Sequence, residues 1–247
     1  MDCGIFIRTY YKDCERLEFT LRSIRKFCSG FSGVTVACPE NSIDLVSAVT
    51  KSTGFDSPIL CNHLSNDFIG QQITKLNADK YCKYDYICHI DSDCIFVRET
   101  NPSDLFLEGR PLMLMAPYNY FYGARHNVPW QTITSKFVGR QVDYEFMRRF
   151  PLTYPRQMYI DLRDHFHNFH NYEINEVWKH IWGDYFSEFN LMGAFSFYSD
   201  SKYHSFSDVT INGVPEVIVK QYCLVSSRDD RTISASDRDE IERILTA

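Results

Sequence analysis

Apolar residues in the first hundred positions form either short continuous runs or a helical spacing. Four runs predict buried strands, at 4–7, 34–38, 58–61 and 86–90. Between them, apolar residues three and four positions apart predict helices, at 17–28, 43–49 and 69–81. Strands that alternate with helices of this length predict an α/β fold with a mostly parallel central sheet and helices on both faces.

The second half of the chain has a mixed pattern. Strands are predicted at 112–115 and 216–222, and helices at 137–149, 156–166, 174–182 and 187–197. Ser236 is expected to cap a terminal helix over 236–245, because acidic residues follow it in the first turn. Since no repeat or linker divides the halves, we expect a single domain over 1–247.

Charge and composition exclude several classes of protein. The chain has 26 Lys and Arg against 32 Asp and Glu, a net charge of −6, and so lacks the basic surface expected of a nucleic-acid partner. Its 44% apolar residues suffice for a core, which excludes disorder. The longest apolar stretch, 112–116, is far shorter than the roughly 20 residues of a membrane span.

The nine cysteines are scattered, and no C-x-x-C pair occurs among them. This usage fits a reducing compartment. Residues 1–4 show no basic leader before an apolar run, so we expect no signal peptide and a cytoplasmic location. Cys82, Cys88 and Cys94 match no zinc spacing, and we interpret them as buried thiols.

Two acidic triplets have different surroundings. Asp91-Ser92-Asp93 directly follows the strand predicted at 86–90, at the sheet edge where α/β proteins bind ligands. Two carboxylates about 4 Å apart repel by about 4 kcal/mol at an effective dielectric constant of about 20, so a divalent cation is expected there. The alternative is a solvated turn or pairing with a Lys or Arg. Asp237-Arg238-Asp239, in contrast, opens a polar helix.

These features together resemble the GT-A (Rossmann-like) glycosyltransferases, which use nucleotide-sugar donors. The resemblance includes small bacterial and large-virus domains and spans nearly the whole chain. It depends on these residues: Arg8-Thr9-Tyr10, Gln72, Lys75-Leu76 and Asp91-Ser92-Asp93, with Phe150-Pro151 and Ser187-Glu188-Phe189 in the second half. The H-x-x-G-x-x-K-P-W signature of one retaining branch does not occur.

The resemblance implies a division of labour between 1–97, which binds metal and donor, and 98–247, which forms an acceptor-binding and catalytic lobe. Asp91 and Asp93 would hold Mn²⁺ or Mg²⁺ against the diphosphate of a donor, most readily a UDP-sugar. Residues assigned to the donor are Arg8, Thr9, Tyr10, Glu40, Lys75 and Ser92. The acceptor would be a hydroxyl of a glycan, glycoprotein or other glycoconjugate. Lys75 has an alternative interpretation as an exposed helix lysine.

An inverting reaction needs a base for the acceptor hydroxyl. Glu188 is the candidate, because the aromatic residues around it would raise its pKa. The alternative is a capping or ion-pair role beside Ser187, and Asp184 is the second candidate for the base. A retaining reaction needs no such base, and the stereochemistry stays open.

Other polar and aromatic residues have two interpretations each. His204 or Asp208 would complete the metal site, although a lone histidine is usually structural. His165, His167 and His170 form either a hydrogen-bonded surface or an acceptor shelf. A sugar wall is predicted from aromatic and polar-tipped residues, against a core role: Tyr118, Tyr120, Phe121, Tyr122, His126 and Trp130. Arg228 and Arg231 either close over the diphosphate or are solvated.

Three alternatives to a transferase follow from the acidic motif and fold. A haloacid-dehalogenase-like phosphatase carries its D-x-D on the first strand and Thr or Val two residues later, where this chain has Ile95. A nucleotidyltransferase would show a Gly-rich loop after the first strand. A non-catalytic glycan-binding domain of the same fold remains open.

Overall fold

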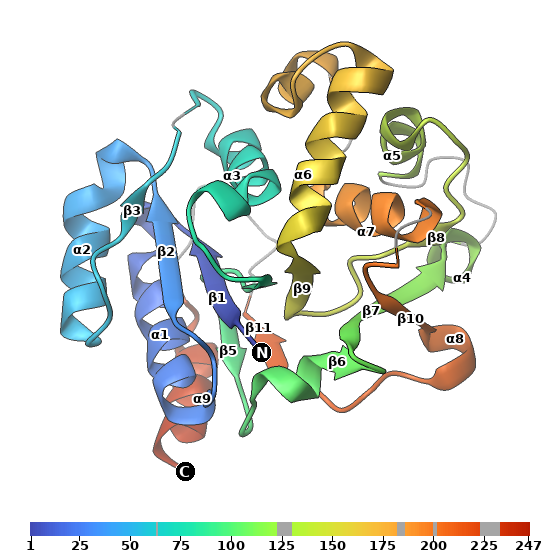
Figure 1. Ribbon diagram of the computed structural model, residues 1–247. Coiled ribbons are helices and arrows are strands. Elements are labelled where there is room, and N and C mark those ends of the chain that lie inside the picture. Colours follow the sequence, from blue (N-terminus) through green and yellow to red (C-terminus); the bar gives the residue numbers. More distant parts are fainter. Residues whose placement is uncertain (63, 123–129, 182–185, 200–201, 223–232) are drawn as a thin grey trace.

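A computed structural model of the protein describes residues 1–62, 64–122, 130–181, 186–199, 202–222 and 233–247. Its central sheet has the strand order β3-β2-β1-β4-β9. The strands are β1 (Cys3–Arg8), β2 (Val34–Cys38), β3 (Ile59–Leu60), β4 (Tyr86–His89) and β9 (Leu152–Pro155). The first four are parallel and β9 is an antiparallel edge strand, so the predicted mostly parallel sheet is confirmed (Figure 1).

Helices cover both faces of this sheet, as predicted (Figure 1). Ile5 and Ile7 pack with α1 (Cys14–Phe27) and α2 (Ile43–Ser52) on one face. Phe6 points to the other face, which is covered by α3 (Asp67–Leu76), α6 (Arg156–His165) and α7 (Glu188–Tyr198). Alternate residues of β1 therefore enter two separate cores, because successive side chains of a strand point to opposite faces.

Two small sheets lie outside the central sheet. One has the order β10-β7-β6, with β8 also paired to β7: β6 (Phe106–Leu107), β7 (Arg110–Pro117), β8 (Tyr144–Glu145) and β10 (Ser205–Asp208). The other pairs β5 (Cys94–Phe96) with β11 (Val219–Gln221). The remaining α-helices are α4 (Tyr118–Tyr122), α5 (Gln131–Val138), α8 (Val209–Asn212) and α9 (Ala235–Thr246).

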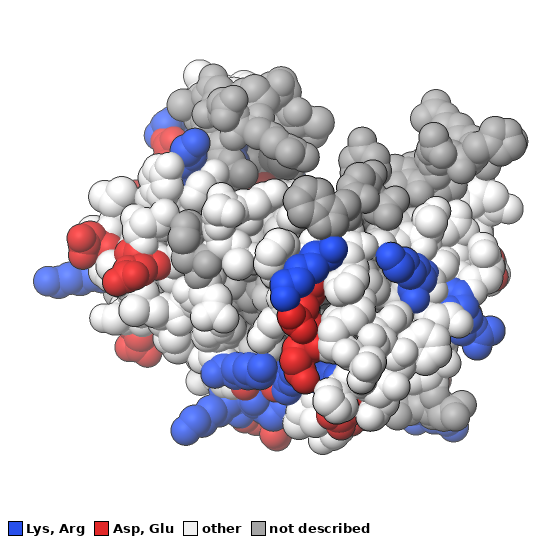
Figure 2. Space-filling view, turned by 90° about the horizontal axis from the view of Figure 1, so that it is seen from above, with Lys and Arg blue, Asp and Glu red and all other residues white. Residues whose placement is uncertain are grey.

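The space-filling view in Figure 2 shows basic and acidic side chains next to one another in several places on this face. Among the described residues, no helix combines the length and apolar character needed to cross a bilayer.

Several predicted elements differ from the structure. The helix predicted over 137–149 is wrong: α5 ends at Val138, because Gly139 adopts a left-handed conformation with φ of +80° and terminates it. The stretch predicted as a helix over 174–182 forms a 3₁₀ helix at Ile174–His180. The cap of α9 is Ser234, whose Oγ accepts a hydrogen bond from the Asp237 amide at 3.1 Å, and not Ser236.

Candidate active site

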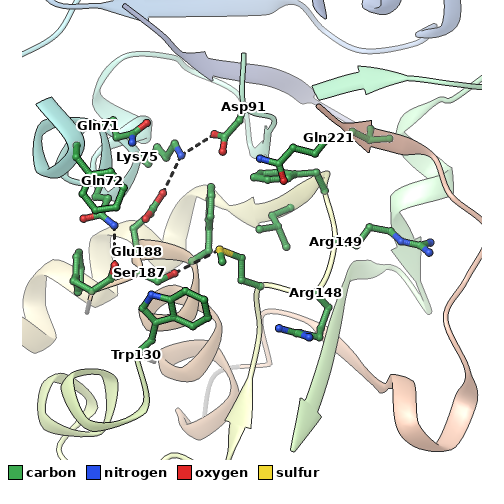
Figure 3. A pocket seen from close by; sticks show the side chains of 17 residues that line it. Gln71, Gln72, Lys75, Asp91, Trp130, Arg148, Arg149, Ser187, Glu188 and Gln221 are labelled. Carbon is green, nitrogen blue, oxygen red and sulfur yellow. Dashed lines mark hydrogen bonds and ion pairs between the residues drawn. The ribbon is translucent and has the colours of Figure 1, made fainter. Parts of the chain in front are cut away.

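A cavity of about 470 Å³ lies beyond the carboxyl end of β4, between α3 and α7 (Figure 3). One face of α3 lines it through Phe68, Gln71, Gln72 and Lys75, whose spacing of three and four places them on the same side of a helix. Asp91 follows β4, and Glu188 begins α7. The predicted ligand edge of the sheet is therefore the location of the cavity.

Lys75 lies between two carboxylates at the centre of this site. Its Nζ is 2.7 Å from Oδ1 of Asp91 and 2.9 Å from Oε1 of Glu188 (Figure 3). The Lys75 side chain is only 5% exposed, and its ammonium lies 4.7 Å from the ring centre of Phe189. Burial lowers the pKa of this ammonium, but the two carboxylates outweigh burial and hold the pKa above its usual value. Lys75 is therefore a charged, buried residue and not the exposed helix lysine of the alternative interpretation.

Glu188 is fixed by the start of α7. Ser187 is the N-cap, since its Oγ accepts a hydrogen bond from the Asn190 amide at 3.3 Å. The Glu188 side chain is 6% exposed, in the first turn of the helix, where the helix dipole favours a negative charge. The structure thus shows the ion pair beside a capping serine that was the alternative to a base.

Asp93 has a different environment from Asp91. Gln221 donates from Nε2 to its two carboxylate oxygens at 3.2 and 3.3 Å, and the Cys94 thiol lies 3.6 Å from Oδ1. Burial, and then the charge of Asp91, raise the pKa of Asp93 to about 6. Asp91 is therefore paired with a lysine, as in the alternative interpretation. Asp93 instead contacts a neutral amide and a neutral thiol. Ser92 is buried, and its carbonyl accepts a hydrogen bond from Thr20.

The other residues assigned to the donor lie outside the cavity lining. Arg8, at the end of β1, forms a two-pronged ion pair with Asp67 at the start of α3, with Nη1 2.8 Å from Oδ2. Thr9 is buried, Tyr10 is half-buried against the Tyr11 ring, and Glu40 is exposed. These residues follow β1 and β2 at the same edge of the sheet as Asp91.

His204 is placed in the core and not at the acidic pair, which corrects the expectation of a third metal ligand. Its Nε2 donates to the Thr153 carbonyl at 2.8 Å, and Ser196 donates to Nδ1 at 2.6 Å. Burial lowers the pKa of His204 to about 4. Asp208, the other candidate, caps α8 by accepting from Thr210 at 2.8 Å. Within the described residues, no cluster of three His, Cys, Asp or Glu could hold a metal.

The histidine group forms a hydrogen-bonded surface. His165 and His170 both donate from Nε2 to the carbonyl of Phe137, at 3.0 and 2.7 Å, and His167 lies 3.2 Å from Glu173.

The predicted aromatic wall is divided by the structure. Tyr118 is buried, Tyr120 is 62% exposed and Trp130 lines the cavity. The side chains of Phe121 and Tyr122, and all of Asp184, His126, Arg228 and Arg231, lie outside what the structure describes.

Sequence reasoning missed four polar residues of the cavity, Gln71, Arg148, Arg149 and Gln221. Arg148 pairs with Glu145, which is fully buried. Arg149 donates to the backbone carbonyls of Pro215 and of Glu216, the latter at 2.7 Å. The two consecutive arginines before Phe150-Pro151 were the available signal, and the wrong helix over 137–149 concealed it.

Comparison with known structures supports the fold. The galactosyltransferase LgtC, in complex with donor and acceptor sugar analogues, aligns with a TM-score of 0.52 and 12% identity over 98% of this chain and 95% of that one. An active-site mutant of LgtC gives 0.50 and 13% over the same shares. The apo-form glycosyltransferase GlyE of Streptococcus pneumoniae gives 0.49 and 12%, over 100% of this chain and 61% of that one. The predicted GT-A-like fold is confirmed.

A search of curated proteins gave no match. One family model matches residues 4–130, which is about half of the chain and includes β1 to β4, both aspartates of the first triplet and Trp130. The protein therefore belongs to DUF6492, a family of unknown function.

Proposed function

We propose that this protein is a glycosyltransferase that binds a nucleotide-sugar donor, most readily a UDP-sugar, in the cavity beyond β4. One observation carries the proposal: the acidic pair at the end of a central strand lies beside a cavity that also holds a buried ion pair, two arginines and a tryptophan. Arginine guanidinium groups suit the anionic oxygens of a diphosphate, and aromatic rings suit the apolar face of a sugar. The GT-A-like fold is consistent with this activity.

A divalent cation fits the donor set at Asp91 and Asp93. Asp93 is an anion that burial and a like charge disfavour, and it contacts the amide of Gln221 and the thiol of Cys94. Mg²⁺ and Mn²⁺ are commonly bound by one or two carboxylates together with water and substrate phosphates. Asp91 and Asp93 would hold the ion, and when bound it would stabilise the charge that develops on the leaving diphosphate.

The protein's own residues would orient the two substrates. Arg8 at the end of β1, Thr9 and Tyr10 in the loop that follows, and Glu40 after β2 would receive the nucleoside. Ser92 would receive the donor sugar. Gln72 donates to the carbonyl of Phe186, two residues before α7, at 2.9 Å. Its buried Oε1 has no hydrogen-bond partner in the described part of the chain, so it is available to accept from a sugar hydroxyl.

The acceptor, a glycan or glycoconjugate hydroxyl, would enter from the side of Trp130 and Arg148, which lie across the cavity from Asp91 in Figure 3. We propose Glu188, held by its ion pair with Lys75, as the base that would take the acceptor proton if the reaction inverts the anomeric carbon. The eight cysteines within the described residues are free thiols, which supports a reducing, cytoplasmic location.

The Lys75–Asp91 ion pair favours a second candidate function. With Asp91 neutralised by a lysine, the same cavity could bind a glycan without metal or nucleotide, as a non-catalytic domain would.

Thermal unfolding and donor turnover distinguish the two. Purified protein would be melted with Mn²⁺ and a panel of nucleotides and nucleotide sugars, and release of nucleoside diphosphate would be followed by mass spectrometry. A transferase predicts a raised midpoint with one nucleotide in the presence of Mn²⁺, and loss of that rise in Asp93→Asn. Asp239→Asn, from the second acidic triplet, is the matched control. A glycan that raises the midpoint when no nucleotide does so would support the binding domain.

A further inference from the structure

The Lys75 ammonium contacts Asp91, the carboxylate at which the proposed function expects a divalent cation. The lysine comes from α3, Asp91 from the end of β4 and Glu188 from the start of α7, so three separate elements converge on one ammonium (Figure 3). Asp91 is the more accessible carboxylate, with its side chain 26% exposed against 6% for Glu188. The Lys75 ammonium is therefore paired with one buried carboxylate, Glu188, and with one more accessible carboxylate, Asp91.

We infer that Lys75 is the resident counter-ion of Asp91 and competes with the divalent cation for it, so that Mn²⁺ or Mg²⁺ binds tightly only together with a nucleoside diphosphate. The inference rests on the proposed function. Lys75 would set the affinity of the site for the metal by acting through Asp91, which makes it a positioning residue.

The geometry makes this competition unavoidable. The Lys75 ammonium is 5% exposed and is held beside Asp91 by Glu188 at 2.9 Å and by the face of Phe189. A divalent cation on Asp91 would share one carboxylate with this ammonium, and like charges at such distances repel strongly in a partly buried site. A diphosphate adds negative charge and oxygen ligands, which offset the repulsion.

The small number of protein ligands supports the same order of binding. The described residues contain no group of three metal-ligating side chains, and the acidic pair alone leaves most of the coordination to other molecules. Among the described residues, metal alone would therefore meet two carboxylates, one of which is already neutralised. Metal with nucleotide would meet the same carboxylates and two phosphates.

Two substitutions change the competition in opposite directions. Glu188→Gln removes one partner of Lys75 and leaves the ammonium to Asp91 alone, which strengthens the competing ion pair. The double variant Lys75→Met/Glu188→Gln removes one positive and one negative charge, so the net charge of the site is unchanged while Asp91 is released. A general electrostatic effect predicts no change in the double variant, whereas direct competition predicts tighter metal binding.

Equilibrium dialysis of Mn²⁺, with and without UDP at equal concentration on both sides of the membrane, measures the affinity without any turnover. The wild type is expected to bind Mn²⁺ at least about tenfold more tightly with UDP than without it. Without UDP, the double variant should bind Mn²⁺ at least about tenfold more tightly than the wild type, and Glu188→Gln should bind it more weakly with UDP present. Lys220→Met, at an exposed ion pair, is the control for loss of a lysine.

Each outcome has one meaning. Tight Mn²⁺ binding by the wild type without UDP, or equal affinities in the wild type and the double variant, would overturn the inference and leave the proposed function intact. No Mn²⁺ binding by the wild type and either variant, with UDP or GDP, would instead contradict the metal-dependent transferase on which the inference rests. If the double variant does not fold, Lys75→Gln/Glu188→Gln, which removes the same two charges but keeps polar side chains, takes its place.

Discussion

Two acidic triplets with the same spacing have opposite surroundings in this molecule. Asp91-Ser92-Asp93 follows a buried central strand, contacts a buried lysine and lies at a cavity. Asp237-Arg238-Asp239 lies in the first turns of α9, where Asp239 is exposed and the Asp237 amide is capped by Ser234. A short sequence pattern acquires chemical meaning only from the element that precedes it, because that element determines burial and access to ligand.

The largest difference between the two acidic triplets is expected in donor turnover. Asp93→Asn is expected to lower donor turnover on the order of 10³-fold, because the metal-binding charge is worth several kcal/mol in the transition state. Asp239→Asn should leave turnover within about twofold, as expected for an exposed residue away from the cavity. Rates of nucleoside diphosphate release measure both. Equal losses in the two variants, or none in Asp93→Asn, would remove the distinction between the triplets.

The ion pairs beside the two triplets should differ in their contribution to stability. Lys75→Met leaves two carboxylates without their cation, one of them buried, and should lower the free energy of unfolding by about 3–5 kcal/mol. Lys220→Met breaks the exposed pair with Glu240, which belongs to α9, and should cost less than about 1 kcal/mol. Urea denaturation at neutral pH measures both. Similar losses of unfolding free energy in the two variants would mean that burial of an ion pair does not determine its contribution to stability here.

Acid should test whether His204 belongs to the first triplet or to the core. The pKa of His204 is about 4 in the folded protein, against about 6.5 in an unfolded chain, because burial disfavours the charged ring. The unfolded chain therefore binds the additional proton, and stability falls as the pH is lowered from about 6.5 to about 4, by about 3 kcal/mol for this residue.

His204→Gln should accordingly reduce the loss of unfolding free energy between pH 7 and pH 4, and the remaining loss should include His89, whose pKa burial also lowers. His167→Gln, at an exposed position, is the control. A His204→Gln variant with the full acid sensitivity of the wild type would contradict the core assignment.

The smallest effect concerns the helix that carries the second triplet. Ser234→Ala should cost about 1 kcal/mol, because it removes the side-chain acceptor for the Asp237 amide. Ser236→Ala, at the cap predicted from sequence, should change stability by less than about 0.5 kcal/mol. Thermal unfolding of the two variants compares them directly, and a larger effect at Ser236 would favour Ser236 as the cap.

The accuracy of the sequence predictions also differs between the halves. The strands of the first half were found because buried parallel strands form continuous apolar runs, and Asp91 was located by its place after one of them. In the second half the left-handed Gly139 ended a helix that apolar spacing had extended across Arg148 and Arg149. Periodicity does not report backbone conformation, so these arginines were missed.

The central contact of the site was beyond reach of sequence reasoning for a different reason. Lys75 and Glu188 were each selected as single candidates, but their pairing joins α3 to α7 across 113 positions and depends on how both helices pack. The two interpretations of His204 were likewise decided by tertiary contacts with Thr153 and Ser196.

A crystal structure of the protein with Mn²⁺ and UDP tests the central claim most directly. We predict anomalous density for manganese on Asp91 and Asp93, with the diphosphate in the cavity beside Lys75. The claim would be contradicted if the nucleotide bound elsewhere, or if Asp91 kept Lys75 as its partner and no metal accompanied a bound nucleotide.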